Sequence, residues 1–162
     1  MSQKGRGARM YHSITFTAGS LRKNTWSDWH LIPVTRPVFA QPNPVYNYVE
    51  VPGADGSLDL TDYLVGRPTY SDRQGTFEFY VVNESSSGQS YGNYADRKAE
   101  IAAFFDGRKM NAYPEDEGGR YYEGRFFFKG WTPDASHSKV TIEYRVKPYW
   151  HKNLPGGQEA GL

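Results

Sequence analysis

The chain has 162 residues, a length that fits one domain, and a formal net charge of +1 from 19 basic and 18 acidic side chains. This balance argues against a dedicated nucleic-acid-binding protein, which needs a strongly basic face. The absence of cysteine excludes disulfides, thiolate metal sites and cysteine nucleophiles, and no apolar run is long enough to span a bilayer. Aromatic residues reach 16%, which is typical of chains rich in strands and interfaces.

A basic N-terminal arm is expected over residues 1–10, which carry Lys4, Arg6 and Arg9 and no acidic residue. The segment has no apolar core, so it does not have the form of a secretory signal. It is expected either to be solvated or to pair with an acidic partner in an assembly. We expect a single β-rich domain over residues 11–152 and a flexible tail over residues 153–162, which show no regular pattern.

Strand patterns dominate the expected domain. They occur, in chain order, at residues 13–17, 29–34, 46–51, 76–82, 109–113, 121–129 and 140–146. The last of these alternates strictly, which indicates one buried and one solvated face. A bulge is expected at Gly124. Six of the ten prolines fall between Pro33 and Pro68, so this region is predicted to be a turn-rich connection with one strand, 46–51.

The turn over residues 52–62 is the clearest local signal in that connection. Its Pro-Gly and Asp-Gly pairs predict positive φ angles at Gly53 and Gly56, with Asp55 and Asp59 bonded to nearby amides. A calcium loop built on Asp55, Asp59 and Asp62 is the alternative, but spacings of four and three do not match the ligand positions of such a loop. We therefore assign a structural and contact role to Pro52, Gly53, Asp55, Gly56 and Asp59.

One helix is expected over Tyr94–Phe105. Asn93 can cap its first turn, and Gly107 is expected to end it. Ile101 and Phe105 lie on its apolar stripe, so we expect them to pack the helix on a sheet.

Residues able to carry chemistry are scattered. The four histidines lack metal-ligand spacing, and no nucleophile elbow, phosphate loop or zinc-protease motif is present. We therefore expect no catalytic residue, metal or cofactor, and a protein that is not an enzyme. The four tryptophans are Trp26, Trp29, Trp131 and Trp150. They are expected either to cap the core or to form exposed platforms on which sugars stack. The residues alone predict an aromatic-rich β domain that serves binding or assembly.

Four segments, in this order, resemble the distal tail proteins of siphophages. They are the turn 51–61, the arginine-led strand 73–79, the helix end 105–109 with the strand motif Tyr121, Tyr122, Gly124 and Arg125, and the terminal strand 142–152 with Pro148 and Tyr149. The resemblance covers about residues 26–152. It implies an antiparallel β-sandwich or barrel-like domain flanked by an α-helix and related to phage tail-tube folds.

The resemblance also implies a function. Members of the family form homohexameric rings at the distal end of a long, non-contractile tail in the virion, join the tail tube to the tip or baseplate, and let DNA pass. Expected partners are therefore other copies of the chain, the tail-tube protein and the hub protein of the tip or baseplate, with the tape-measure protein as a further candidate. Neither sequence-specific nucleic-acid binding nor a membrane is implied, and assembly is expected in the host cytoplasm.

Two other functions stay open at this point. A tail-tube, tail-terminator or other tail subunit would share the fold and differ in its partners. A carbohydrate-binding module would need an exposed row of aromatic side chains. Many members of the family carry a second, carbohydrate-binding domain; this sequence ends shortly after Lys152, so sugar binding by such a domain is not expected.

Overall fold

The computed structural model describes residues 10–83, 87–133 and 137–162. Seven strands form one antiparallel sheet in the order β2-β1-β9-β10-β11-β8-β3. Their bounds are Ile14–Ala18 (β1), Leu21–Asn24 (β2), Leu31–Pro33 (β3), Arg73–Val81 (β8), Asp106–Pro114 (β9), Tyr122–Thr132 (β10) and Lys139–Val146 (β11). With the helix α1 (Tyr94–Phe104), this confirms the predicted class, mainly β and antiparallel with a flanking helix.

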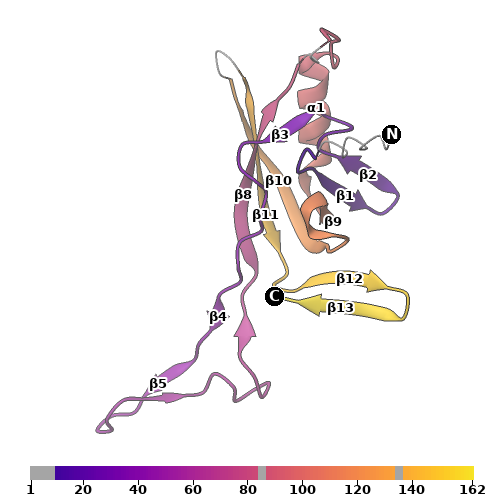
Figure 1. Cartoon of the computed structure of the whole chain (residues 1–162). Helices are drawn as coiled ribbons and strands as arrows, with labels where there is room; N and C mark the ends of the chain where they lie inside the picture. The colour runs from indigo at the N-terminus through magenta and orange to yellow at the C-terminus, as the bar shows by residue number, and fades with distance from the viewer. Residues whose placement is uncertain (1–9, 84–86, 134–136) are drawn as a thin grey trace, which may run out of the picture.

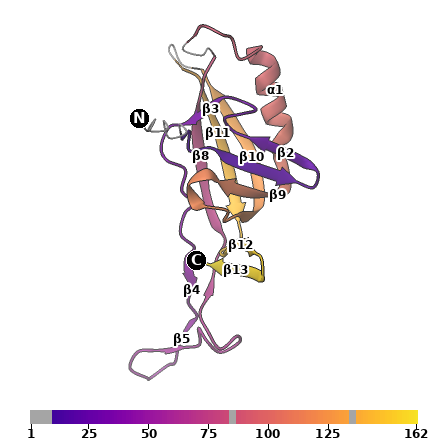
Figure 2. The same ribbon diagram turned by 45° about the vertical axis from the view of Figure 1, so that its right-hand side comes forward.

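The sheet curves strongly around its core. In Figures 1 and 2, β1 and β2 run across β8 and β11 rather than alongside them, and α1 lies beside the sheet. The curvature brings Phe16 of β1 to Phe126 of β10, with ring centroids 5.0 Å apart, and to Phe105, at 4.9 Å. Strand β11 shows why one face is buried: its apolar residues alternate with Glu143 and Arg145, which are exposed. The strand predicted at 140–146 is confirmed.

The helix begins where the sequence predicts. The Asn93 side chain accepts a hydrogen bond from the Ala95 amide at 2.8 Å, which satisfies a first-turn donor. Ile101 and Phe105 are both buried in the core. Arg97 is also buried, a residue that the apolar stripe did not reveal.

The sequence predicts that Gly107 ends the helix, and this prediction is wrong. The helix stops at Phe104, and the chain enters β9 directly, because the Phe105 carbonyl already accepts a hydrogen bond from the Phe128 amide. Gly107 lies inside β9 with φ of +90°, next to the Phe127 ring, where the pairing of β9 with β10 shifts register. Its role is to permit this irregularity in the sheet.

The predicted bulge at Gly124 is wrong. Gly124 pairs regularly with Met110 on one side and Val146 on the other, and the register shifts fall after it, at residues 125–127 and 128–130. A Cβ atom at position 124 would collide with the Arg145 carbonyl and the Val146 backbone. The glycine is needed because two backbones approach closely there.

The tail predicted to be flexible, residues 153–162, instead belongs to a hairpin. Strand β12 (Trp150–Leu154) pairs with β13 (Gly157–Gly161). Trp150 is buried against Gly161, and its indole nitrogen donates to the Leu162 carbonyl at 3.2 Å. Most of the other hairpin residues are exposed, which explains why the sequence shows no apolar alternation.

The proline-rich connection contains more strand than the single one predicted. Strand β4 (Pro44–Val45) pairs with β7 (Thr69–Tyr70), and β5 (Tyr48–Glu50) pairs with β6 (Ser57–Asp59). A short 3-10 turn, η1 (Glu115–Glu117), follows β9. No helix in the described part of the chain is long and apolar enough to cross a membrane.

Candidate assembly surface

A projecting hairpin, residues 43–71, extends away from the sheet and is the most prominent feature of the molecule (Figures 1 and 2). At its base the Ser71 amide donates to the Asn43 carbonyl at 2.9 Å, next to the β4–β7 pair. Further out, β5 and β6 pair and carry the hairpin to its tip. The prolines fit this geometry because the ladders are only two strands wide and have free edges.

The turn that joins β5 to β6 adopts the predicted backbone. Gly53 and Gly56 have φ angles of +81° and +78°, in the region that favours glycine. At the end of β6, the Asp59 carboxylate accepts a hydrogen bond from the Thr61 amide at 2.9 Å. Hydrogen bonds from the Thr61 side chain and amide lower the pKa of Asp59. Asp55 is exposed, and no hydrogen bond of its side chain is found within the described residues.

The projecting hairpin exposes an unusual amount of apolar surface. Tyr63 and Leu64 are 80% and 89% exposed. Nine of the 17 exposed large hydrophobic residues of the described chain lie in this segment: Val45, Tyr46, Tyr48, Val49, Val51, Leu58, Tyr63, Leu64 and Val65. A patch of this kind on a folded protein marks an interaction surface.

A groove of about 360 Å³ runs along the hairpin. It is lined by Val45, Tyr46, Asn47, Leu60, Thr61, Leu64, Val65 and Thr69. A two-stranded ribbon cannot cover its own apolar side chains, because it has no second layer. The hairpin therefore needs a partner to remove these residues from water.

The root of the hairpin is held by a buried arginine. Arg73, 2% exposed, donates from Nε to the Pro148 carbonyl at 2.8 Å and from Nη1 to the Ala40 carbonyl at 3.1 Å. The Ala40 amide donates to the Tyr144 hydroxyl at 2.8 Å, and burial raises the pKa of Tyr144. The guanidinium also lies over the Tyr122 ring, 5.2 Å from its centroid. Both backbone groups of Ala40 are thus fixed just before the hairpin begins.

Sequence reasoning missed this role of Arg73, although a signal was present. Arg73 lies on the inward-facing side of β8, on the same face as the buried residues Phe77, Phe79 and Val81. A charged residue in such a position needs hydrogen-bond partners inside the fold, and here they are backbone carbonyls.

The residues of the strand motif singled out from the sequence, Tyr121, Tyr122, Gly124 and Arg125, lie in different surroundings. Tyr122 is buried, and its pKa is raised by burial and by the nearby carboxylate of Glu117. Tyr121 instead packs at the surface against Tyr113, with ring centroids 5.0 Å apart. Arg125 donates to the Gly107 carbonyl at 3.0 Å.

The terminal motif, Pro148 and Tyr149, meets the root of the hairpin. Pro148 accepts from Arg73, and the Tyr149 hydroxyl accepts from Arg67 Nη1 at 2.9 Å. The terminal motif therefore contacts the root of the projecting hairpin, whereas Ile101 and Phe105 stay in the core.

The tryptophans form no exposed row in the described part of the chain. Trp29 and Trp150 are buried. Trp26 stacks on Tyr11, with ring centroids 3.8 Å apart, and Trp131 meets the Tyr94 ring edge-on at 4.7 Å. Their faces are occupied by neighbouring side chains.

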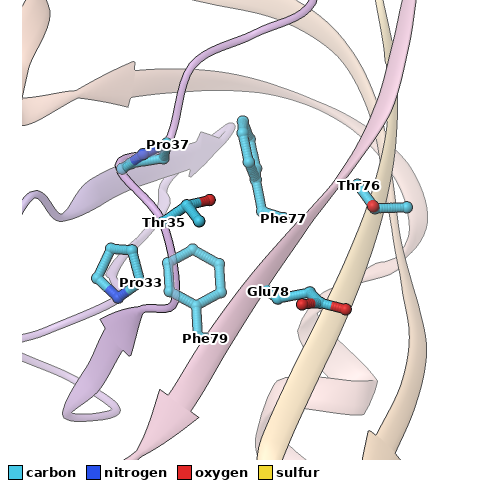
Figure 3. Close-up of a pocket in the computed structure, with 7 residues that line it drawn as sticks. All are labelled: Pro33, Thr35, Pro37, Thr76, Phe77, Glu78 and Phe79. Carbon is cyan, nitrogen blue, oxygen red and sulfur yellow. The ribbon is translucent and has the colours of Figure 1, made fainter.

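A small cavity of about 140 Å³ lies between β8 and the segment that follows β3 (Figure 3). Phe77 and Phe79 point toward Pro33 and Pro37, while Glu78 points away (Figure 3). Glu78 is the one ionisable side chain among the seven lining residues, so the cavity holds no acid–base pair. Within the described residues, no three histidine or acidic side chains gather as metal ligands would.

Comparison with solved structures shows that the chain shares its fold with a phage protein. A search of protein-family models and of curated proteins found no match. Among solved structures, the chain is similar to the Dit protein of phage SPP1, described as a paradigm of the hub adsorption apparatus in phages that infect Gram-positive bacteria. The TM-score is 0.54 and the identity 18%; the match covers 86% of this chain and 52% of the SPP1 protein. The chain thus spans about half the length of that relative and shares its fold.

Proposed function

We propose that this protein is a structural subunit at the distal end of a long, non-contractile phage tail, where six copies form a ring that joins the tail tube to the tip or baseplate and lets DNA pass. The fold similarity to the SPP1 Dit protein and the resemblance of four sequence segments to distal tail proteins support this proposal. The proposed partners are other copies of the chain, the tail-tube protein, the hub protein and the tape-measure protein. We assign no catalytic activity to the protein.

The observation that carries the proposal is the projecting hairpin with its exposed apolar side chains. A cyclic assembly repeats one contact between two different surfaces until the ring closes. An arm that projects from one copy onto the next provides such a contact. Tyr63 and Leu64, the two most exposed large hydrophobic residues in the described part of the chain, are the side chains expected to be buried by it.

A pair of variants tests the proposal. Tyr63 and Leu64 are both changed to Asp in one variant; in the control, Leu154 is changed to Asp, because it is also exposed but lies in the β12–β13 hairpin. Mass measurement and negative-stain imaging are done with the protein alone and with the tail-tube protein. We expect wild type and control to form six-fold rings and the double variant to stay monomeric.

Two results would contradict the proposal. One is a wild-type protein that is monomeric at high concentration and forms no ring on the tail tube. The other is a double variant that assembles like the wild type. A ring found along the tube or at its head-proximal end would instead favour a tail-tube or tail-terminator subunit.

A further inference from the structure

Three cations stand side by side on the sheet face that points away from the core. Lys109 of β9 and Arg145 of β11 are both direct cross-strand partners of Arg125 in β10. Like charges opposite each other in neighbouring strands destabilise a sheet. The row of cations lowers the stability of the free monomer, which indicates that it serves to bind a partner.

The row is only partly neutralised within the chain. Glu123 pairs with Lys109 and, at 3.4 Å, with Lys147, and the first of these contacts lowers the pKa of Glu123. Asp72 pairs with Arg145 at 2.8 Å. Arg125, in the middle, donates to a backbone carbonyl and meets no carboxylate among the described residues. Four cations thus share two acidic side chains.

An exposed aromatic ring lies beside these charges. Phe127 is 45% exposed, two residues after Arg125 on the same face of β10. Together they border a shallow hollow of about 550 Å³ lined by Asp72, Lys109, Glu123, Gly124, Arg125, Phe127, Arg145, Val146 and Lys147. We call these residues the basic patch. Its chemistry fits a segment that offers carboxylates together with an aromatic or aliphatic side chain.

The projecting hairpin is a segment of that chemistry. It contains four acidic residues and one basic residue, Arg67, so its net charge is −3. In the β5–β6 pair, Tyr48 lies opposite Asp59 and Glu50 lies opposite Ser57. Because side chains alternate along a strand, Tyr48, Glu50 and Asp59 share one face of the hairpin. This face carries one aromatic ring and two carboxylates.

We propose that the basic patch of one copy receives the Tyr48, Glu50 and Asp59 face of the hairpin of a neighbouring copy. The ring of Tyr48 would pack on Phe127, and the carboxylates would lie near Arg125, which lacks one in the monomer. The hairpin leads away from its own sheet in both views, so the occupant is a second copy (Figures 1 and 2). This inference rests on the proposed function, because it names the surface that the projecting hairpin meets.

Charge reversal tests the pairing. Arg125→Glu and Glu50→Lys should each weaken self-association at least about tenfold, measured by sedimentation velocity, because each places like charges in the contact. Combining both changes in one chain should restore most of the association. Lys98→Glu is the matched control, since Lys98 is exposed on α1, outside the patch. Lys147→Glu provides a second patch variant, and thermal melting checks that each variant is folded.

The absence of cysteine allows a direct test of contact. Tyr48→Cys protein mixed with Phe127→Cys protein should form a disulfide-linked dimer on mild oxidation, and adding Arg125→Glu to the second chain should suppress it. No cross-link under conditions where the wild type assembles would overturn the inference.

The outcomes separate this inference from the proposed function. If the Tyr63 and Leu64 double variant fails to assemble but Arg125→Glu assembles like the wild type, the hairpin mediates assembly and the basic patch does not receive it. If neither change affects assembly, both proposals fail. If Arg125→Glu abolishes binding of duplex DNA in a gel-shift assay and leaves self-association unchanged, the patch is a nucleic-acid surface and the inference is wrong.

Discussion

Replacing Arg73 with Met should loosen the root of the projecting hairpin and destabilise the whole domain. Methionine is of similar length and apolar, so it fills much of the same space but leaves the Ala40 and Pro148 carbonyls without a donor. Each of these hydrogen bonds comes from a charged group, at 3.1 and 2.8 Å. Such bonds contribute about 1.5–3 kcal/mol each, or roughly 3–6 kcal/mol for the pair.

Part of this loss is offset, because the substitution also removes the cost of holding a charge in the interior. We therefore expect the free energy of unfolding to fall by about 2–4 kcal/mol, a large share of the 5–15 kcal/mol that is typical of a domain. Arg73→Lys should recover little of it, since a single ammonium group lacks the planar fork that reaches both carbonyls.

Equilibrium unfolding in urea measures the change, with Gln74→Met as the control on the exposed side of the same strand. Limited proteolysis gives a local readout, and we expect faster cleavage near residues 40–43 in the Arg73→Met variant. A loss of stability below about 1 kcal/mol, with unchanged proteolysis, would refute the view that Arg73 holds the root.

Three other variants test the fold. Ile101→Asp buries an unpaired charge under the helix and should cost about 3 kcal/mol or more in thermal or chemical melting; a variant that melts like the wild type would show that α1 does not pack as described. Gly124→Ala should be strongly destabilising because its Cβ has no room, whereas Gly130→Ala, which meets open space, should be nearly neutral. The ion pair of Glu123 with Lys109 lowers the pKa of Glu123, so it stabilises the fold above pH 4.5, and this stabilisation is lost as the pH falls through the folded-state pKa. Glu123→Gln should therefore reduce the acid-induced drop in melting temperature.

The parts of the fold that could be predicted are those set by local patterns. Residues 140–146 alternate because one face of β11 is buried, and the Asn93 cap depends only on residues within one helical turn. The φ angles of Gly53 and Gly56 follow from turn chemistry in the same way.

The rest depends on contacts between distant residues. The strand β5 lies inside the predicted strand 46–51, but the other strands of the projecting hairpin are only two or three residues long, so no periodicity marks them. The partners of Arg73 lie 33 and 75 residues away, and only the folded chain brings them together. Gly107 looks like a helix end in the sequence because the sequence does not show that Phe105 pairs with Phe128 of β10.

The order of strands in the sheet leaves the projecting hairpin free to differ in length. Strands β3 and β8 are neighbours in the sheet, so everything between them, the projecting hairpin included, is one excursion between adjacent strands. The hairpin can therefore become longer or shorter while the strand order and the other connections of the domain stay the same. Removing two residues from each side of the hairpin would shorten it by about 7 Å, since each strand residue adds about 3.3 Å. The excursion thus acts as a spacer whose length sets the distance to a neighbouring molecule, while the sheet stays the same.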